Sequence, residues 1–341
     1  MSERLSDRFF ARGREFLGVE TPILCGAMTW VSEPNLVSAV ANAGGFASLA
    51  GGNAPPEILR AQIEETLRLT DRPFGVNLIT IAPNYGEHLA IVRDLGLPFV
   101  IFAGSFPRER EVRVAKESGA RVLAFASTHS IARRMLDFGV DGLILEGMEA
   151  GGHVGHVSLS VLLQQVLFEV ERVPVFVAGG IGRGRMLAHL FLMGAAGVQL
   201  GTLFAVAEES IAHPAFKERF IRANARDAVS TPQYDSRLPV VAVRALRNKS
   251  TDDFGRLQLD LLRRMDAGEI GRVEAQERVE EFWVGALRRA VMDGDVDRGS
   301  LMAGQSVGLV DRVRPVREIL KILIEETERE LRRVRETLRA D

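Results

Sequence analysis

The sequence predicts an α/β protein built as a (β/α)8 TIM barrel with a C-terminal helical addition. Eight short, strand-like apolar runs alternate with longer helix-compatible segments between residue 22 and about residue 205. The runs are apolar at nearly every position, which is typical of parallel strands that helices cover on both faces. A doubly wound sheet would favour a G-x-G-x-x-G turn after its first strand. The turn here runs from Gly26 to Trp30 and lacks that pattern, so eight strand–helix units favour the closed barrel.

The first four predicted strands span residues 22–27, 46–50, 74–79 and 99–103, and the next four span residues 122–126, 142–145, 173–178 and 197–200. The segments between them are longer and compatible with helices, among them residues 33–42, 56–69, 130–138 and 183–193. This order places each strand beside the next one along the chain, with a helix outside each connection.

Beyond residue 205 the alternation stops. Residues 208–229 and 244–290 are predicted to be mostly helical, and residues 316–338 form a long charged helix with apolar residues on one face. No repeat or low-complexity linker interrupts the chain, so the addition is expected to pack on the barrel. We therefore predict a barrel over residues 1–205 and a mainly helical addition, with substrate-side loops, over residues 206–341.

Composition narrows the class of protein. The formal net charge of -2 gives no basic field for nucleic acid, and no apolar run is long enough to cross a membrane. A single cysteine excludes an internal disulfide, and the charged N-terminus has no signal-peptide core. These features predict a cytoplasmic protein that binds neither nucleic acid nor membranes.

His153 lies on a glycine-rich loop directly after the sixth predicted strand. Gly151, Gly152 and Gly155 flank it, and glycines let a backbone approach a flat or phosphorylated ligand closely. The carboxyl ends of barrel strands carry catalytic residues, so His153 is more readily explained as functional than as a surface histidine. His156 is interpreted as a bystander. Zinc would need three or four ligands, and we predict no metal site.

Two further glycine clusters follow the seventh and eighth predicted strands. They contain Gly179 and Gly180, and then Gly197, Gly201 and Thr202. Such glycines can simply make tight turns. Their joint position favours a bound phosphate, because the turns after strands seven and eight of these barrels offer backbone N–H groups to a dianion.

Other strand ends carry polar residues for which the sequence allows two roles each. Asn77 ends the third strand, where an amide can donate to a flavin or nicotinamide ring and accept from it, or can simply cap a helix. Ser127 and Thr128, after the fifth strand, are likewise either caps or ring contacts. Cys25 lies within the first strand and is interpreted as a buried thiol rather than a nucleophile.

The chain resembles the FMN-dependent nitronate monooxygenase superfamily, which includes the flavin-dependent enoyl-acyl-carrier-protein reductases of the FabK type. The resemblance runs from Pro22 to about Val310. It rests on Pro22-Ile23-Leu24 with Met28, Gly75-Val76-Asn77, the loop of residues 149–155, Gly179-Gly180, and residues 197–202. The resemblance implies that His153 is catalytic. It also implies that FMN contacts Met28, Asn77, Ser127, Glu146, Gly151, Gly152, Gly179, Gly180, Gln199, Gly201 and Thr202.

Three features resemble the reductase branch more than the nitronate enzymes: Met28-Thr29-Trp30, Glu146-Gly147-Met148-Glu149, and residues 294–305. Residues 230–241 and 104–107 depart from the reductases. The resemblance therefore implies reduction of trans-2-enoyl thioesters with NADH or NADPH, with an acyl carrier protein as a possible partner and a homodimer as a possible assembly. The alternative is oxidation of small alkyl nitronates with O2. A third hypothesis is a flavin- or phosphate-binding barrel without catalysis.

Overall fold

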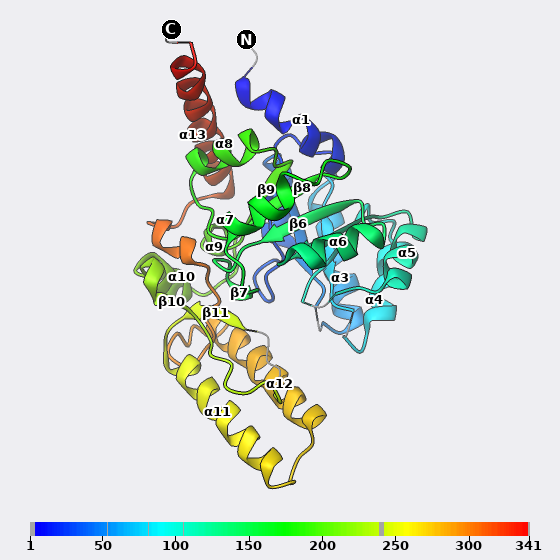
Figure 1. Cartoon of the computed structure of the whole chain (residues 1–341), viewed down its shortest axis with the longest axis vertical. Helices are drawn as coiled ribbons and strands as arrows, with labels where there is room; N and C mark the ends of the chain where they lie inside the picture. Colours follow the sequence, from blue (N-terminus) through cyan, green and yellow to red (C-terminus); the bar gives the residue numbers. More distant parts are fainter. Residues whose placement is uncertain (1–3, 53, 81, 105, 239–241, 340–341) are drawn as a thin grey trace.

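The computed structural model describes residues 4–339 except residues 53, 81, 105 and 239–241. Eight parallel strands close into a barrel in the order β1-β2-β3-β4-β5-β6-β8-β9 (Figure 1). Closure is made by β1 and β9, with Ile23 in register with Val198. The predicted TIM barrel is confirmed. Its strands are β1 (Ile23–Cys25), β2 (Phe46–Ala50), β3 (Gly75–Leu78), β4 (Phe99–Phe102), β5 (Arg121–Ala126), β6 (Gly142–Glu146), β8 (Val175–Ala178) and β9 (Gly197–Leu200).

Large apolar side chains fill the inside of the barrel. Because neighbouring residues of a strand point to opposite faces, every second residue contributes to this interior. The interior cluster includes Phe46, Phe99, Ile101, Ile144 and Phe176, which are all buried. The side chains of this cluster pack so closely that a neighbouring strand needs a glycine. A Cβ atom at Gly75, the first residue of β3, would lie 2.4 Å from the Ile101 Cδ1 atom.

Helices surround the strands. The helices that follow the strands in turn are α2 (Pro34–Asn42), α3 (Pro56–Leu69), α4 (Tyr85–Asp94), α5 (Glu109–Glu117), α6 (His129–Asp137), α7 (Leu159–Leu162) continued by a π-helix (Leu163–Leu167), and α8 (Gly184–Leu192). The first helix, α1 (Leu5–Leu17), places Leu17 in the interior cluster and so covers the N-terminal end of the barrel.

The last helix, α13 (Val316–Thr337), returns to the barrel and packs beside α8 (Figure 1). Glu326 accepts a hydrogen bond from the backbone N–H of Gly184 at 2.7 Å, and Thr327 donates to the Gly184 carbonyl at 3.0 Å. Glu328 accepts hydrogen bonds from the backbone N–H groups of Leu5 and Ser6, so α13 also holds the start of α1. The apolar face predicted for this helix is buried against these neighbours.

The segment between β9 and α13 forms the rest of the addition. It contains α9 (Thr202–Ala205), α10 (Pro214–Ile221), a 3-10 turn (Ala225–Asp227), β10 (Ala228–Ser230), β11 (Val243–Leu246), α11 (Lys249–Asp266), α12 (Arg272–Val291) and a second 3-10 turn (Gln305–Leu309). Helices α11 and α12 form a hairpin that extends away from the barrel (Figure 1). Phe254 and Trp283 pack inside this hairpin with their ring centroids 4.3 Å apart.

Two helical predictions after residue 205 were only partly right. Residues 208–229, predicted as helix, contain α10, a 3-10 turn and the first residues of β10, and the predicted helix from residue 244 begins as β11. The division of the chain at residue 205 stays a prediction, because the helices after it lie both in the hairpin and against the barrel. In the described part of the chain no helix has the length and apolar character needed to span a bilayer.

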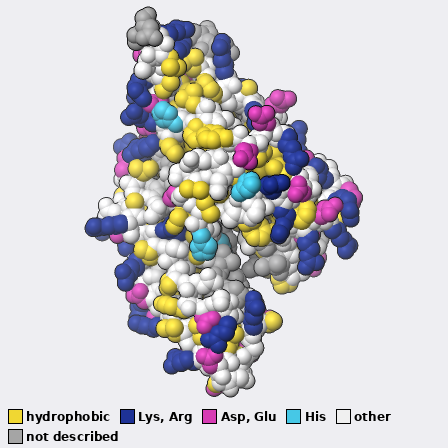
Figure 2. Space-filling view, viewed as in Figure 1, with side chains coloured by type: hydrophobic (Ala, Val, Ile, Leu, Met, Phe, Trp, Pro, Cys, Tyr) yellow, Lys and Arg dark blue, Asp and Glu magenta, His cyan; other side chains and the backbone are white. Residues whose placement is uncertain are grey.

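Basic and acidic side chains are interspersed on the face shown in Figure 2. Many charged side chains of the described residues form ion pairs near the surface, for example Arg237 with Asp235 and Asp266. Exposed pairs of this kind contribute little to stability, since water and salt screen them.

Candidate active site at the C-terminal end of the barrel

Three of the predicted cofactor residues lie in one layer at the top of the barrel interior. Asn77, Glu146 and Gln199 sit near the carboxyl ends of β3, β6 and β9, on the register positions that face inward. The Asn77 side chain is buried and donates from Nδ2 to the Ile101 carbonyl at 3.1 Å. The Gln199 amide lies against Gly26, where an added Cβ atom would come within 2.9 Å of Nε2. The structure therefore places polar side chains on an otherwise apolar floor.

The Glu146 carboxyl has a special electrostatic position. It is partly covered by the barrel walls, and no hydrogen bond or ion pair of the described residues reaches it. Burial disfavours the charged form and raises the pKa of Glu146 to about 8. At neutral pH this side chain is therefore mainly a neutral acid, which can donate a hydrogen bond to a ligand as well as accept one.

The loop that carries His153 is fixed by a second, three-stranded sheet. Residues Gly152–His153 form β7, which pairs antiparallel with β11, and β11 pairs in turn with β10. His153 is in register with Val243, and the next residue, Val154, donates its N–H to the Ala242 carbonyl at 2.9 Å. Gly152 has a φ of 77°, a conformation that glycine adopts without strain. The His153 side chain is exposed at this edge.

Arg244, on β11, holds the same loop by hydrogen bonds to backbone carbonyls. It is in register with Gly152, and its side chain is only 4% exposed. The guanidinium donates from Nε to the Met148 carbonyl at 2.9 Å and from Nη1 to the Ala228 carbonyl at 2.7 Å. Burial lowers the pKa of Arg244, and the nearby Glu149 carboxylate opposes that shift. Arg244 is not among the site residues predicted from the sequence.

A segment from the addition closes the loop on its other side. The backbone N–H of Gly304 donates to Thr202 Oγ1 at 3.0 Å, and that of Gln305 donates to the Glu149 carbonyl at 2.9 Å. Gly151 packs so closely that an added Cβ atom would lie 2.5 Å from the Gly304 nitrogen. Residues 303–305 thus join the His153 loop to the start of α9. No local sequence signal predicted this contact, because its partners are about a hundred residues apart.

The two predicted phosphate turns lie next to the loop. Gly179 and Gly180 have φ values of 99° and 68°, which favour glycine. A Cβ atom at Gly179 would come within 2.9 Å of the Gly147 carbonyl oxygen, so a side chain there would collide with the start of the His153 loop. In the described residues, the N–H groups of Gly180 and Gly201 donate to no backbone carbonyl. These two N–H groups are therefore open to an acceptor on a ligand.

The remaining predicted residues lie around the same opening. A Cβ atom at Gly201 would be 3.6 Å from the Met28 Sδ atom, which places the first loop beside the second phosphate turn. Ser127 packs against the His153 loop, since an added Cβ atom at Gly155 would be 2.5 Å from its own Cβ. Thr128 is a helix cap, which is one of the two roles predicted for it. Its Oγ1 accepts a hydrogen bond from the Ile131 N–H at 3.2 Å.

Other residues singled out in the sequence fit simpler roles. Cys25 is buried, and burial raises the pKa of its thiol to about 12, so it is not a ready nucleophile. His156 is exposed. Within the described ranges, no group of three or more His, Cys, Asp and Glu side chains is arranged to hold a metal ion.

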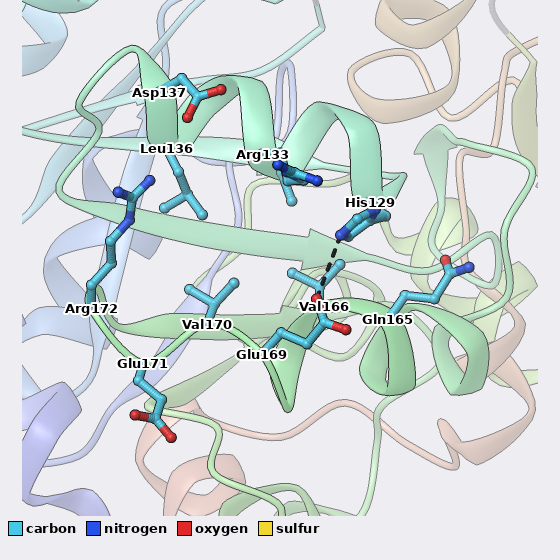
Figure 3. Close-up of a pocket in the computed structure, with 11 residues that line it drawn as sticks. His129, Arg133, Leu136, Asp137, Gln165, Val166, Glu169, Val170, Glu171 and Arg172 are labelled. Atoms are coloured by element: carbon cyan, nitrogen blue, oxygen red, sulfur yellow. Dashed lines mark ion pairs between the residues drawn. The ribbon is translucent and has the colours of Figure 1, made fainter.

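A groove on the surface of the described residues lies away from the strand ends. It has a volume of about 570 Å³ and lies on the outside of the barrel, between α6 and the π-helix that follows α7 (Figure 3). His129 and Glu169 face each other across it at 3.7 Å (Figure 3). Because this groove is separate from the strand ends, it is not part of the candidate active site.

The residues at the strand ends fit an FMN group. Neutral and amide hydrogen-bonding side chains form the floor, and the turns at Gly180 and Gly201 have backbone N–H groups that could meet a phosphate. Close glycine contacts, as at Gly26 and Gly201, keep the opening free of Cβ atoms.

Comparison with known proteins is consistent with this site. A model of the nitronate monooxygenase family matches residues 12–90 and 79–326. The (3aS,4S,5R,7aS)-5-hydroxy-7a-methyl-1-oxo-octahydro-1H-indene-4-carboxyl-CoA dehydrogenase of Mycobacterium tuberculosis is 30% identical, over 91% of this chain and 94% of that protein. A nitronate monooxygenase of Pseudomonas aeruginosa is 28% identical, over 94% of this chain and 99% of that protein. The structure of FabK from Thermotoga maritima matches with a TM-score of 0.83 and 36% identity, over 96% and 98% of the two chains.

Proposed function

Because the chain belongs to the nitronate monooxygenase family and is a flavin oxidoreductase, we propose that it binds FMN and reduces trans-2-enoyl thioesters with NADH or NADPH. The thioester would be carried by coenzyme A or by an acyl carrier protein. The observation that carries the proposal is the contact of residues 303–305 with both the His153 loop and Thr202. These residues belong to a segment that resembles the reductase branch, and here they form part of the site.

Similarity supports the same choice. The chain is 36% identical to FabK of Thermotoga maritima and 28% identical to the nitronate monooxygenase of Pseudomonas aeruginosa, with nearly complete coverage in both comparisons. The relative at 30% identity is named for a carboxyl-CoA compound, which is a thioester. The name of that relative therefore supports a thioester substrate for this chain.

The floor and the glycine turns would hold FMN, which supplies the redox chemistry when it is bound. Asn77, Glu146 and Gln199 would hydrogen-bond the polar parts of the group, and the N–H groups of Gly180 and Gly201 would hold its phosphate. Met28, Ser127, Gly151, Gly152, Gly179 and Thr202 would shape the walls. The neutral form of Glu146 suits this role, because it adds no charge beneath an anionic ligand.

His153 would act on the thioester. As the double bond is reduced, negative charge develops on the thioester oxygen, and a hydrogen-bond donor there stabilises the transition state. His153 could donate that hydrogen bond, and could deliver the proton that the α-carbon needs. Pairing of β7 with β11 and the buried Arg244 guanidinium would keep the imidazole in one place, which such a contact requires.

Oxidation of alkyl nitronates with O2 is the second candidate, since the family match and the Pseudomonas relative carry that name. The same residues would hold FMN, and His153 would bind or deprotonate a small anion. This reaction needs no pyridine nucleotide. A non-catalytic barrel, the third hypothesis of the sequence analysis, would not turn over any of these substrates.

The decisive experiment is anaerobic mixing of the purified holoprotein with NADH and, separately, with NADPH. The reductase is expected to lose its flavin absorbance quickly and to regain it when crotonyl-CoA is added. Slow or absent bleaching, together with oxygen uptake on adding propyl-1-nitronate, would select the nitronate reaction. Kinetics with the same preparation identify the preferred nicotinamide. Sedimentation tests the hypothesis that the protein is a homodimer.

A further inference from the structure

Trp30 has an unusual backbone conformation. In the described part of the chain it is the one non-glycine residue with a positive φ, at 67°. A bulky L-residue is disfavoured in this left-handed region, so the conformation persists only where the surroundings impose it. Observed strain of this kind is often linked to function, because a less strained residue would otherwise fit better.

The turn around Trp30 is fixed by several hydrogen bonds. The Met28 carbonyl accepts from the N–H groups of Val31 and Ser32 at 2.9 and 2.8 Å. Ser32 is buried, and its hydroxyl accepts from the Met28 N–H and donates to the Gly26 carbonyl, each at 2.9 Å. These contacts fix the backbone of the turn on both sides of Trp30.

The turn lies at the mouth of the candidate active site. It follows β1 directly, and Met28 contacts the region of Gly201. The Trp30 side chain is 39% exposed, and no hydrogen bond or aromatic contact among the described residues involves its indole. By contrast, Trp283 is 2% exposed inside the α11–α12 hairpin. An indole face is thus held in the open beside the site.

The chemistry of the turn selects the kind of ligand. Residues 26–32 carry no charged side chain, so the turn has no ion-pair partner for the anionic group of a nitronate or for the pyrophosphate of a nicotinamide cofactor. It offers instead apolar surface from Trp30 and the neighbouring Met28. Apolar surface stabilises a ligand in proportion to the apolar area that it covers, roughly fourfold in affinity for each methylene that is fully buried.

We propose that Trp30 is a specificity-determining residue whose exposed indole covers the apolar acyl chain of the thioester. This inference rests on the proposed reductase function. It adds a dependence on chain length: an enoyl group with more methylenes covers more of the indole and gains more from it. A four-carbon crotonyl group would scarcely reach beyond the reacting double bond and would gain little.

The test compares kcat/KM for crotonyl-CoA and trans-2-octenoyl-CoA in Trp30→Gly, Trp30→Phe and Trp283→Phe variants. Trp30→Gly is expected to lower kcat/KM for the octenoyl substrate about tenfold more than for crotonyl-CoA. Trp30→Phe should retain most of the preference. The Trp283→Phe control should leave the ratio of the two substrates unchanged. Equal losses for both chain lengths in Trp30→Gly would overturn the inference while leaving the reductase function intact.

Stability separates this role from a structural one. In Trp30→Gly the relief of backbone strain at a φ of 67° opposes the greater unfolded-state entropy of glycine and the loss of the covered part of the indole, so we expect a melting temperature close to that of wild type. A marked fall in the melting temperature would show instead that the indole is a packing residue, and would count against the proposal.

Direct binding provides a readout without turnover. The chain has two tryptophans, so Trp30 is the remaining fluorophore of its kind in the Trp283→Phe variant. Octanoyl-CoA, which cannot be reduced, is expected to shift the emission of Trp30 to shorter wavelength, and coenzyme A alone should not. An unchanged emission at saturating octanoyl-CoA would overturn the proposal. If wild-type protein reduces neither thioester, the proposed function and this inference fail together.

Discussion

The N–H of Gly304 donates to the hydroxyl of Thr202 across 3.0 Å in the buried interior, and this single bond connects two distant parts of the chain. Thr202 begins α9, directly after the last barrel strand, whereas Gly304 belongs to the return segment before α13. Gly304 also touches the backbone of Gly151. The His153 loop, a predicted phosphate turn and the addition therefore form one unit.

Loss of the Thr202 hydroxyl should weaken this unit. In Thr202→Val the shape is kept, but the buried Gly304 N–H loses its acceptor, and an unsatisfied buried donor costs about 1–3 kcal/mol. Urea unfolding of the variant should show a free energy of unfolding lower by that amount. Thr202→Ser keeps the hydroxyl and should lose clearly less. If the valine variant were as stable as wild type, the hydrogen bond would not be a significant stabilising contact.

His153→Ala should leave FMN bound and slow turnover by roughly a hundredfold or more, which is the contribution expected of a positioned acid or hydrogen-bond donor. The flavin content is measured from the visible spectrum of the purified protein, and turnover from oxidation of NADH or NADPH with crotonyl-CoA. His156→Ala is the matched control and should keep nearly full activity. Normal turnover in His153→Ala would exclude its catalytic assignment.

Removing Arg244 should disorder the His153 loop. In Arg244→Met the apolar stem is retained, but the Met148 and Ala228 carbonyls lose a charged donor, and hydrogen bonds to charged groups contribute about 1.5–3 kcal/mol. We expect lower stability by thermal melting and a lower kcat. Arg247→Met, an exposed arginine of the same segment, is the control. Parallel behaviour of the two variants would contradict the supporting role of Arg244.

The Glu146 carboxyl should give the flavin-free protein a characteristic pH dependence. Its pKa is about 8 in the fold and near the ordinary glutamate value of 4.5 in the unfolded chain, so the folded state binds more protons between these values. Stability is therefore highest below the unfolded pKa and declines as the pH rises from about 4.5 to about 8. Glu146→Gln cannot ionise, so it should remove this decline.

Melting temperatures of flavin-free wild type and Glu146→Gln check this prediction. The two proteins should differ little at acidic pH, and the variant should become the more stable one as the pH rises toward 9 (about one unit above the folded pKa). Glu171→Gln, which removes an exposed carboxyl, should follow the wild-type curve. A constant difference between wild type and Glu146→Gln at all pH values would show that Glu146 does not carry the shifted proton.

The sequence by itself determined the barrel and most of the strand ends. Each barrel strand buries both of its faces and is therefore apolar at nearly every position. This pattern lies within a few consecutive residues, so the sequence reveals it. The glycine turns after β8 and β9 were also predictable from the sequence. The positive φ at Gly179 and Gly180 favours glycine, and the glycines themselves are visible in the sequence. The apolar face of α13 was visible too.

Only the tertiary structure decided what these local features meet. Closure of the barrel brings Asn77, Glu146 and Gln199 into one layer, although they lie on strands well apart in the sequence. Pairing of β7 with β11 places Arg244 behind His153, and residues 303–305 reach Thr202 from across the addition. Such contacts depend on which apolar faces and backbone edges satisfy one another after folding. No local pattern encodes them, because each partner alone would be equally compatible with a surface position.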